Sequence, residues 1–227
     1  MNNIGPSLKK ILQYPTAIVG LFVIGLLVAV SIYTVIAIPY PEAIRMWRGG
    51  EEVWYQNPKF APPTWFNFFS AKKYSESFAV TSANGEIQKT ITPGNDSMQT
   101  YVMSYEFDFA YDVYPQDMLL YINSSFIEKQ PFLSVEWLTP DGRTIRVSNF
   151  AVGQQFTYRF SQDDKLAAKL RVDETIPALF SNPETGEVLK GKYKLIITGT
   201  TFEPNASLDV EFVLHGQVYG LAGTDHA

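Results

Sequence analysis

Residues 16–38 read TAIVGLFVIGLLVAVSIYTVIAI, and none of these 23 side chains is charged. A helix of this length rises about 35 Å, enough to cross a hydrocarbon core of about 30 Å. A buried helix of a soluble domain rarely stays apolar on every side for this long, and the apolar region of a cleaved signal peptide is usually shorter. The stretch therefore predicts a transmembrane helix bounded by Thr16 and Ile38.

The charges on either side of this stretch bear on its orientation. Residues 1–15 form a short lead that contains Lys9 and Lys10 and no acidic residue, whereas Arg45 and Arg48 follow the stretch. The two sides of the stretch therefore carry equal numbers of basic residues, and the positive-inside rule alone does not decide the orientation. A long tail, however, can be translocated largely regardless of its charge. We expect a cytoplasmic N-terminus in the cell (plasma) membrane, with the bulk of the chain extracytoplasmic.

The 189 residues that follow residue 38 are enough for one domain with its own core. Removing Lys9 and Lys10 from the 18 basic residues leaves 16 against 23 acidic ones, a net charge of −7 for this part. Such an acidic surface argues against nucleic acid and anionic lipid as partners. The chain has no cysteine, which excludes disulfides, cysteine-ligated zinc and a cysteine nucleophile.

Residues 39–75 form an aromatic-rich juxtamembrane segment, in which a short helix should end near Gly49-Gly50. Pro62 and Pro63 exclude a regular helix or a central strand after it. Two interpretations of its rings remain open: packing against a domain core, or an interfacial belt at the headgroup level. The rings belong to Trp47, Trp54, Tyr55, Phe60, Trp65, Phe66, Phe68 and Phe69.

From residue 76 the apolar pattern changes to a period of two, which is typical of β-strands. In TYVMSYEFDFAYDV (100–113) the odd positions from Tyr101 to Tyr111 are large and apolar and the even ones mostly small or acidic. This predicts one long strand with a buried and a solvated face. Segments 77–83 and 86–92 flank Asn84-Gly85, which predicts a hairpin.

The remaining pattern predicts about nine strands and one short helix within a domain spanning 76–220. The further strands are expected at 118–126, 132–140, 143–150, 155–160, 192–202 and 207–220, with a tight turn at 140–142. The helix is expected within 161–175, capped by Ser161 and ended by Pro177. The fold class is therefore mainly β, with an antiparallel β-sandwich as the economical architecture.

Side chains that could carry chemistry are sparse. The two histidines, His215 and His226, match no catalytic or metal-binding spacing, and no nucleotide-binding or hydrolase motif occurs. The acidic pairs 51–52, 163–164 and 173–174 could hold calcium, but solvated turns and helix ends explain them better. We expect no enzyme activity, no catalytic or metal site and no cofactor. Candidate glycosylation sites are Asn95, Asn123 and Asn205.

Both ends of the chain carry short motifs. Residues 9–42 combine two lysines, a Pro15-x-Ala17-x-x-Gly20 step, an apolar run and a closing Pro39-Tyr40. Residues 219–227 read YGLAGTDHA, with Gly223, Thr224 and Asp225 as a Gly-Thr-Asp element. In this order the segments resemble the first span, and the lead into the second span, of permease subunits of the dipeptide/oligopeptide (peptide/nickel-type) ABC transporters.

The resemblance implies the N-terminal part of a permease subunit that imports peptides or related solutes, with residues 221–227 leading toward a second span. Its implied partners are membrane lipid, a partner permease subunit, ATPase subunits and an extracytoplasmic solute-binding protein. The β-domain would be an insert over the pore that docks or gates this binding protein. The alternative is a single-pass anchored β-sandwich that binds a partner or ligand. A third reading is a scaffold that pairs its edge strands with a neighbour.

Overall fold

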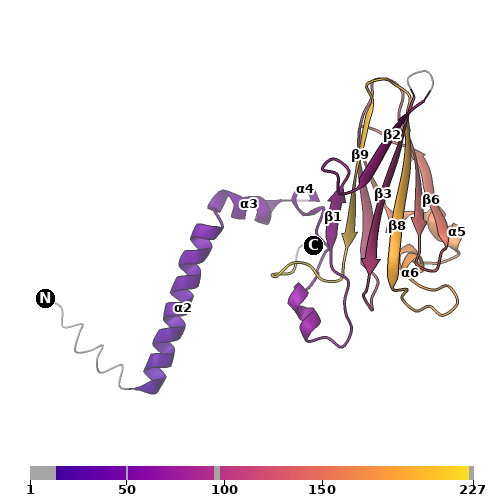
Figure 1. Ribbon diagram of the computed structural model, residues 1–227. Helices are drawn as coiled ribbons and strands as arrows, with labels where there is room; N and C mark the ends of the chain where they lie inside the picture. Colours follow the sequence, from indigo (N-terminus) through magenta and orange to yellow (C-terminus); the bar gives the residue numbers. More distant parts are fainter. Residues whose placement is uncertain (1–13, 50, 95–97, 225–227) are drawn as a thin grey trace. The chain divides into compact units, whose positions relative to one another are not determined.

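The structure is a computed structural model that describes residues 14–49, 51–94 and 98–224. It divides into two compact units, Met1–Trp54 and Tyr55–Ala227 (Figure 1). The first unit is helical and the second contains every named strand. The aromatic segment is therefore shared between the units, because residues 55–75 belong with the strands.

Helix α2 (Pro15–Ala37) accounts for most of the described part of the first unit, and none of its residues is buried. Within the described residues it is the one helix long and apolar enough to cross a membrane. Both ends lie one residue before the expected bounds. Pro15 fits the first helical position, where its missing N–H would have no partner. Ile38 is extended because it precedes Pro39, whose ring disfavours a helical conformation there.

Two short helices follow, α3 (Tyr40–Arg48) and α4 (Glu51–Trp54). Glu42 pairs with Arg45 one turn later, which supports α3 on its polar side. The indole N–H of Trp54 donates to the carbonyl of Met46 at 3.0 Å. Helix α3 ends at Arg48 with Gly49 as its cap, as the sequence predicts.

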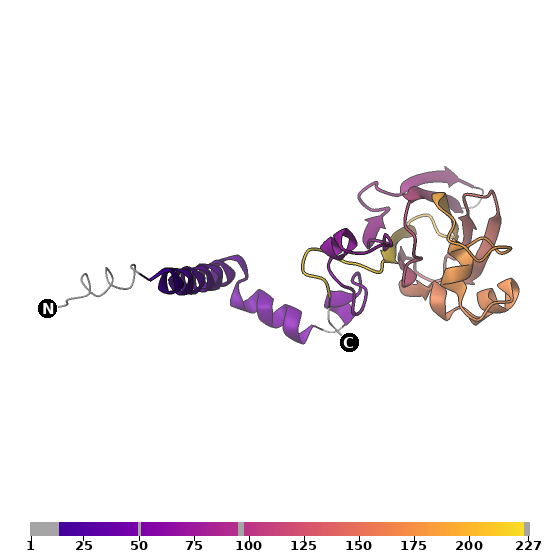
Figure 2. The ribbon, with the colours of Figure 1, turned by 90° about the horizontal axis from the view of Figure 1, so that it is seen from below.

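The second unit is an antiparallel β-sandwich of two sheets (Figures 1 and 2). The four-stranded sheet has the order β1 (Phe78–Thr81), β9 (Ser207–His215), β4 (Asp117–Ser125) and β7 (Gln155–Arg159). The five-stranded sheet has the order β2 (Gln88–Pro93), β3 (Gln99–Phe109), β8 (Gly191–Thr201), β5 (Phe132–Leu138) and β6 (Thr144–Ala151). This confirms the predicted fold class.

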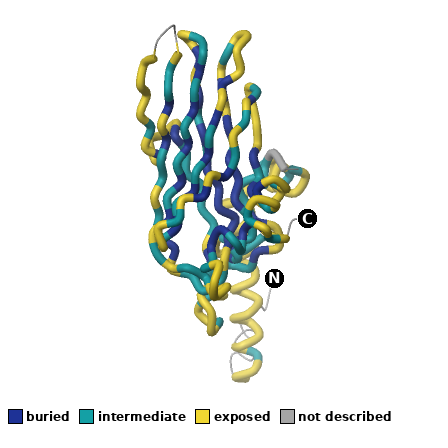
Figure 3. The backbone as a smooth tube through the Cα atoms, turned by 90° about the vertical axis from the view of Figure 1, so that its right-hand side faces the viewer, coloured by how far each residue is buried: buried dark blue, intermediate teal, exposed yellow. Residues whose placement is uncertain are grey.

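The core lies between the sheets, and strands such as β5 and β8 alternate buried with more accessible positions along their length (Figure 3). On β3 the predicted odd positions face inward, from Tyr101 to Phe109. Trp137 of β5 is fully buried at the centre of a ring cluster, and its N–H donates to the carbonyl of Leu179 at 3.2 Å. The rings around it belong to Phe107, Phe180, Tyr193 and Phe212, all within 6.4 Å between centroids.

The hairpin predicted at Asn84-Gly85 is wrong. The turn itself forms, with Gly85 at φ 87° and the N–H of Ile87 bonded to the carbonyl of Thr81. However, β1 pairs with β9 and β2 pairs with β3, so the two strands lie in different sheets. Ile87 is buried in the core, and the chain crosses between the sheets at this point rather than folding back.

The helical region after β7 also differs from the prediction. It consists of the 3-10 turn η2 (Phe160–Gln162) and two helices, α5 (Asp164–Leu170) and α6 (Thr175–Phe180). Asp163, not Ser161, caps α5, because its carboxylate accepts from the N–H groups of Lys165 and Leu166. Ser161 instead donates to Asp117 at 2.8 Å. Pro177 lies in the first turn of α6, where proline is tolerated.

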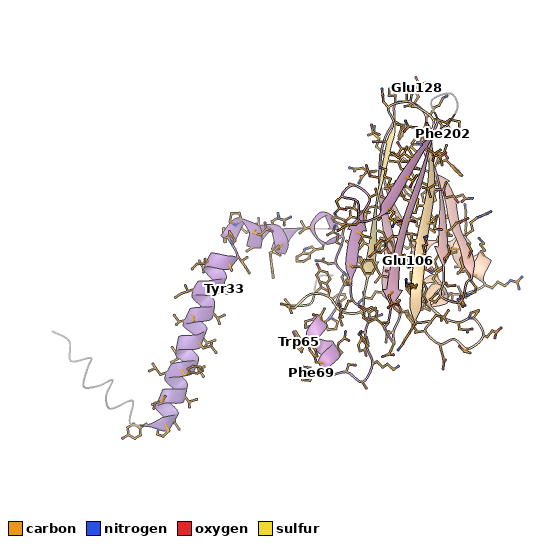
Figure 4. All side chains as sticks on the ribbon, in the orientation of Figure 1. Tyr33, Trp65, Phe69, Glu106, Glu128 and Phe202 are labelled. Atoms are coloured by element: carbon orange, nitrogen blue, oxygen red, sulfur yellow. The ribbon has the colours of Figure 1, made fainter. Side chains whose placement is uncertain are left out.

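A carboxylate orders the loop after β4. Glu203, in the connection from β8 to β9, accepts from the backbone N–H groups of Ile127, Glu128 and Lys129 at 2.6–2.7 Å. These bonds to the ionised form hold the pKa of Glu203 below its ordinary value. Figure 4 places Glu128 and Phe202 at the same end of the sandwich.

We expect Trp137→Phe to lower the free energy of unfolding by about 2–3 kcal/mol, because it leaves a cavity and an unpaired carbonyl at Leu179. Chemical denaturation followed by circular dichroism would measure it. Trp47→Phe is the control, since Trp47 is 89% exposed, and it should change the value by less than about 0.5 kcal/mol. Equal effects of the two changes would contradict the assigned core.

Glu203→Gln should make the free energy of unfolding of the sandwich depend less on pH in the acidic range. The lowered pKa means that the ionised group stabilises the fold above its unfolded pKa of about 4.3, and that this contribution is lost as the pH falls through the folded pKa. Urea midpoints of the variant should be lower than wild type at pH 7 and converge with it below about pH 3. Glu184→Gln, in an exposed loop, is the control. A constant offset at both pH values would contradict the assignment.

Candidate functional site: an aromatic surface beside the end clamp

The segment that begins at Tyr55 covers part of the outer face of the four-stranded sheet. Leu119 and Val213 are register partners in β4 and β9, and both are fully buried although they lie outside the core cluster between the sheets. On the same strands, the Tyr121 hydroxyl donates to the carbonyl of Tyr55 at 3.1 Å, and Nε2 of His215 lies 3.0 Å from that oxygen. His215 is therefore a buried docking residue for this segment.

A polar cluster completes this attachment. The Gln56 amide donates to the carboxylate of Glu211 and, at 2.9 Å, to the Tyr55 hydroxyl. Burial, and then the nearby Glu211 carboxylate, raise the pKa of the Tyr55 hydroxyl. The cluster fixes the point where the chain reaches the sandwich.

The chain leaves the sandwich next to the same point. Residues 58–64 and 219–224 lie side by side and exchange backbone hydrogen bonds, a pairing that we call the end clamp. The N–H of Tyr219 donates to Pro62 at 2.9 Å, and the N–H of Thr64 donates to Gly220 at 2.7 Å. The N–H of Thr224 donates to Ala61 at 2.6 Å. No sequence pattern predicts this pairing, since its partners are far apart in the chain.

The Gly-Thr motif residues lie in the end clamp. The Thr224 hydroxyl donates to the carbonyl of Pro58 at 2.6 Å and accepts from the N–H of Ala61 at 2.9 Å. Gly223 has φ 74°, and a Cβ there would lie 2.8 Å from the nitrogen of Pro63. Only glycine fits such a position without strain. Asp225 lies outside the described residues.

Large apolar side chains project from the end clamp and from the 3-10 helix η1 (Thr64–Phe68) (Figure 4). Phe68, Phe69 and Leu221 are each more than 80% exposed. The Trp65 N–H donates to the carbonyl of Leu221 at 3.0 Å, and the Trp65 ring meets Phe69 edge-on. We call this set the aromatic surface; its members are Phe60, Trp65, Phe66, Phe68, Phe69 and Leu221, all exposed.

The rings of the juxtamembrane segment differ in how far they are buried. Tyr55 is half-buried and its ring contacts Tyr121 of the sandwich, whereas Trp54 is half-buried within the first unit, where it bonds to Met46. Phe60, Phe68 and Phe69 are exposed, as an interfacial belt requires. Phe60 also has φ 52°, a conformation that costs a residue with a side chain about 1–2 kcal/mol. Leu221 joins this surface only through the end clamp, so its role could not be read from the sequence.

The other candidate sites of the sequence stay separate in the fold. Within the described residues, no group of three or more His, Asp or Glu side chains could hold a metal ion. Asn123 is exposed on β4 and Asn205 is exposed between β8 and β9, whereas Asn95 and His226 lie outside the described residues. Glycosylation of these asparagines remains a prediction.

A shallow depression lies beside the lysine pair at 72–73. It has a volume of about 520 Å³ and is lined by Lys72, Asp112, Tyr114, Glu187 and Lys190 among others. Lys190 and Asp112 form an ion pair across it, and the Lys190 ammonium lowers the pKa of Asp112. This ion pair already uses the charges of Lys190 and Asp112.

No protein-family model matches the sequence, and no curated protein matches it. Among solved structures, the chain is similar to TmCBM61, solved in complex with β-1,4-galactotriose, at 10% identity and a TM-score of 0.28, covering 68% of this chain and 92% of that one. It is also similar to carbohydrate-binding modules of the β-sandwich superfamily, at 8% identity and a TM-score of 0.30, covering 70% and 62%. A structure of infectious bursal disease virus, Gx strain, matches at 11% identity and a TM-score of 0.30, covering 63% and 34%. With these low scores, the fold assignment rests on the strand pairing itself.

We expect Thr224→Val to loosen the end clamp without unfolding the sandwich. It removes a hydroxyl that bonds Pro58 and Ala61, which costs about 1–2 kcal/mol locally. Amide hydrogen exchange at Ala61 and Thr64 should therefore accelerate about 5–30-fold, with the core strands unchanged. Thr144→Val, at an exposed position of β6, is the control. Unchanged exchange at Ala61 would show that the clamp does not depend on this hydroxyl.

Proposed function

We propose that the protein is a membrane-anchored β-sandwich that binds or scaffolds a partner on the extracytoplasmic side. The observation that carries the proposal is helix α2, which has 23 residues, no charged side chain and no buried residue. Burying one Leu, Ile, Val or Phe side chain is worth about 1.5–3 kcal/mol. Leaving a whole helix of them in water is therefore unfavourable, and a bilayer supplies the missing burial.

The sandwich supports a binding or scaffold role rather than catalysis. Its described histidine, His215, is buried and docks the segment at Tyr55. Asp163 caps a helix and Asp112 pairs with Lys190, so these carboxylates have structural partners. Both sheets end in edge strands, β1, β2, β6 and β7, which are available for pairing with a partner chain.

A second candidate is favoured by the end clamp. An insert in a loop between two membrane spans must begin and end at neighbouring points, and the clamp holds residues 58–64 against residues 219–224. Gly223 and Thr224, which carry the resemblance to peptide-transporter permeases, are the residues that close it. In this second proposal the sandwich lies over the pore of an ABC importer and docks its solute-binding protein.

Introducing charged residues into α2 tests the membrane anchor. We expect the full chain to stay in the membrane fraction during carbonate extraction. Leu26→Arg with Val30→Arg should release it, because each arginine at the helix centre costs about 2.5–3.5 kcal/mol of insertion free energy. The control carries the same two arginines at exposed sandwich positions, Ile91 and Ile127, and should remain in the membrane. Release of the wild-type chain would overturn the proposal.

The side of the membrane is tested by labelling. The chain has no native cysteine, so Ile127→Cys introduces a single thiol at a side chain that is 86% exposed. An impermeant maleimide should label this thiol on intact cells, and no labelling before lysis would contradict the orientation.

The two candidates are separated by the coding sequence beyond residue 227. Further apolar spans after a Gly-Arg-Asp continuation would favour the importer subunit, and a stop codon directly after Ala227 would overturn it. In an intact importer, deleting residues 76–215 should impair uptake and binding-protein affinity. Unchanged uptake and affinity would reject the docking role.

A further inference from the structure

The segment that carries most of the aromatic surface differs in charge from the rest of the chain. Residues 55–75 contain Lys59, Lys72 and Lys73 and no acidic residue, whereas the whole chain has a net charge of −5. All three lysines are exposed. Exposed aromatic rings beside lysines favour the headgroup region of a bilayer, where the rings lie among the glycerol groups and the ammonium groups meet phosphates.

The aromatic surface is too apolar to be explained by scattered exposure. Phe68 and Phe69 are adjacent and 86% and 82% exposed, and Leu221 on the other side of the end clamp is 82% exposed. A group of such exposed apolar side chains on one end of a folded domain marks an interaction site. The hydrogen bonds of the end clamp and of Trp65 hold the group in place, so its members can act together.

The chain itself limits how far this surface can lie from a membrane that holds α2. Residues 38–54 join α2 to the second unit, and most of them are helical, in α3 and α4. At about 1.5 Å per helical residue and 3.4 Å per extended one, this connection spans at most about 35 Å. The bilayer surface is therefore within reach of the second unit.

Helix α3, within this connection, has the same character. Tyr40 and Trp47 are seven residues apart, which places them on one side of the helix, and both are highly exposed at 78% and 89%. Glu42 and Arg45 form an exposed ion pair elsewhere on the helix. A short helix with aromatic and charged sides, directly after a span, is typical of a segment that lies in the membrane interface.

We propose that the aromatic surface docks into the headgroup region of the same bilayer that α2 crosses, with Lys59 and Lys72 facing lipid phosphates. This inference rests on the proposed membrane anchor. It makes the second unit a peripheral domain with a fixed orientation rather than one that tumbles on a tether. The end of the sandwich at Glu128 and Phe202, opposite to Trp65 and Phe69 in Figure 4, then points away from the membrane toward a partner.

The test uses single cysteines, each carrying a nitroxide spin label, in the full chain reconstituted into lipid nanodiscs. The labelled positions are Phe68 in the aromatic surface, Val28 in α2, and Ile127 as the matched control, which has the same 86% exposure as Phe68. Collisions with oxygen, which partitions into lipid, are compared with collisions with a water-soluble nickel complex. We expect the Phe68 and Val28 labels to favour oxygen and the Ile127 label to favour the nickel complex.

Each outcome decides a different claim. A water-like label at Val28 would overturn the membrane anchor itself. A lipid-exposed label at Val28 with a water-like label at Phe68 would overturn only the docking. A Phe68 label shielded from both reagents would show that protein, such as a second copy of the chain, covers the surface instead, and this would also overturn the proposal.

A second variant tests whether the surface acts as a unit. With the label at Leu221, the change Phe68→Ser with Phe69→Ser should shift the label toward the water-like ratio, at least several-fold. The control change, Ile91→Ser with Ile127→Ser, removes two exposed apolar side chains outside the aromatic surface and should leave the ratio unchanged. Circular dichroism of each variant verifies the fold, and an unmoved Leu221 label in a folded double variant would contradict docking through these rings.

Discussion

Packing of the two sheets across their shared aromatic core is the interaction on which the rest of the second unit depends. The pairing of β3 with β8 runs in continuous antiparallel register from Gln99 with Thr201 to Phe109 with Gly191. It places Phe107 and Tyr193 against Trp137 of the neighbouring strand β5. Because the strand ends are fixed by this core, the loops and the end clamp attach to rigid supports.

At each end of the sandwich, one side chain forms hydrogen bonds with several backbone groups and thereby orders the loops. Glu203 accepts from three consecutive N–H groups at one end. At the other end, the Thr224 hydroxyl joins Pro58 and Ala61. Such bonds satisfy backbone groups that loops would otherwise leave to water, and they restrict how the loops move. An ordered clamp can present Phe68 and Phe69 as a defined surface, which a flexible loop could not.

Charge and apolar surface are distributed unevenly along the chain, and this distribution supports the membrane proposals. Helix α2 is apolar throughout, and residues 55–75 combine aromatic rings with lysines. The acidic residues that make the chain negative overall lie mostly after residue 75. An acidic sandwich should be repelled by anionic lipid, so a local basic and aromatic segment would set which end faces the bilayer. The sheet faces and edge strands then remain available to a partner.

The features that depend on local geometry could be predicted from the sequence. The apolar run gave α2 to within one residue at each end, and the alternation from Tyr101 to Phe109 gave the long strand β3 with its buried face. Both predictions rest on the side-chain periods of helices and strands, about 3.6 and 2 residues, which a short stretch of sequence is enough to reveal. Which segments meet is visible in the three-dimensional fold alone. It separated β1 and β2 into different sheets despite the turn at Gly85, selected Asp163 over Ser161 as a cap, and brought Thr224 to Ala61 across 163 residues of chain. These choices depend on competition among distant segments for buried surface and hydrogen-bond partners, which no local pattern records.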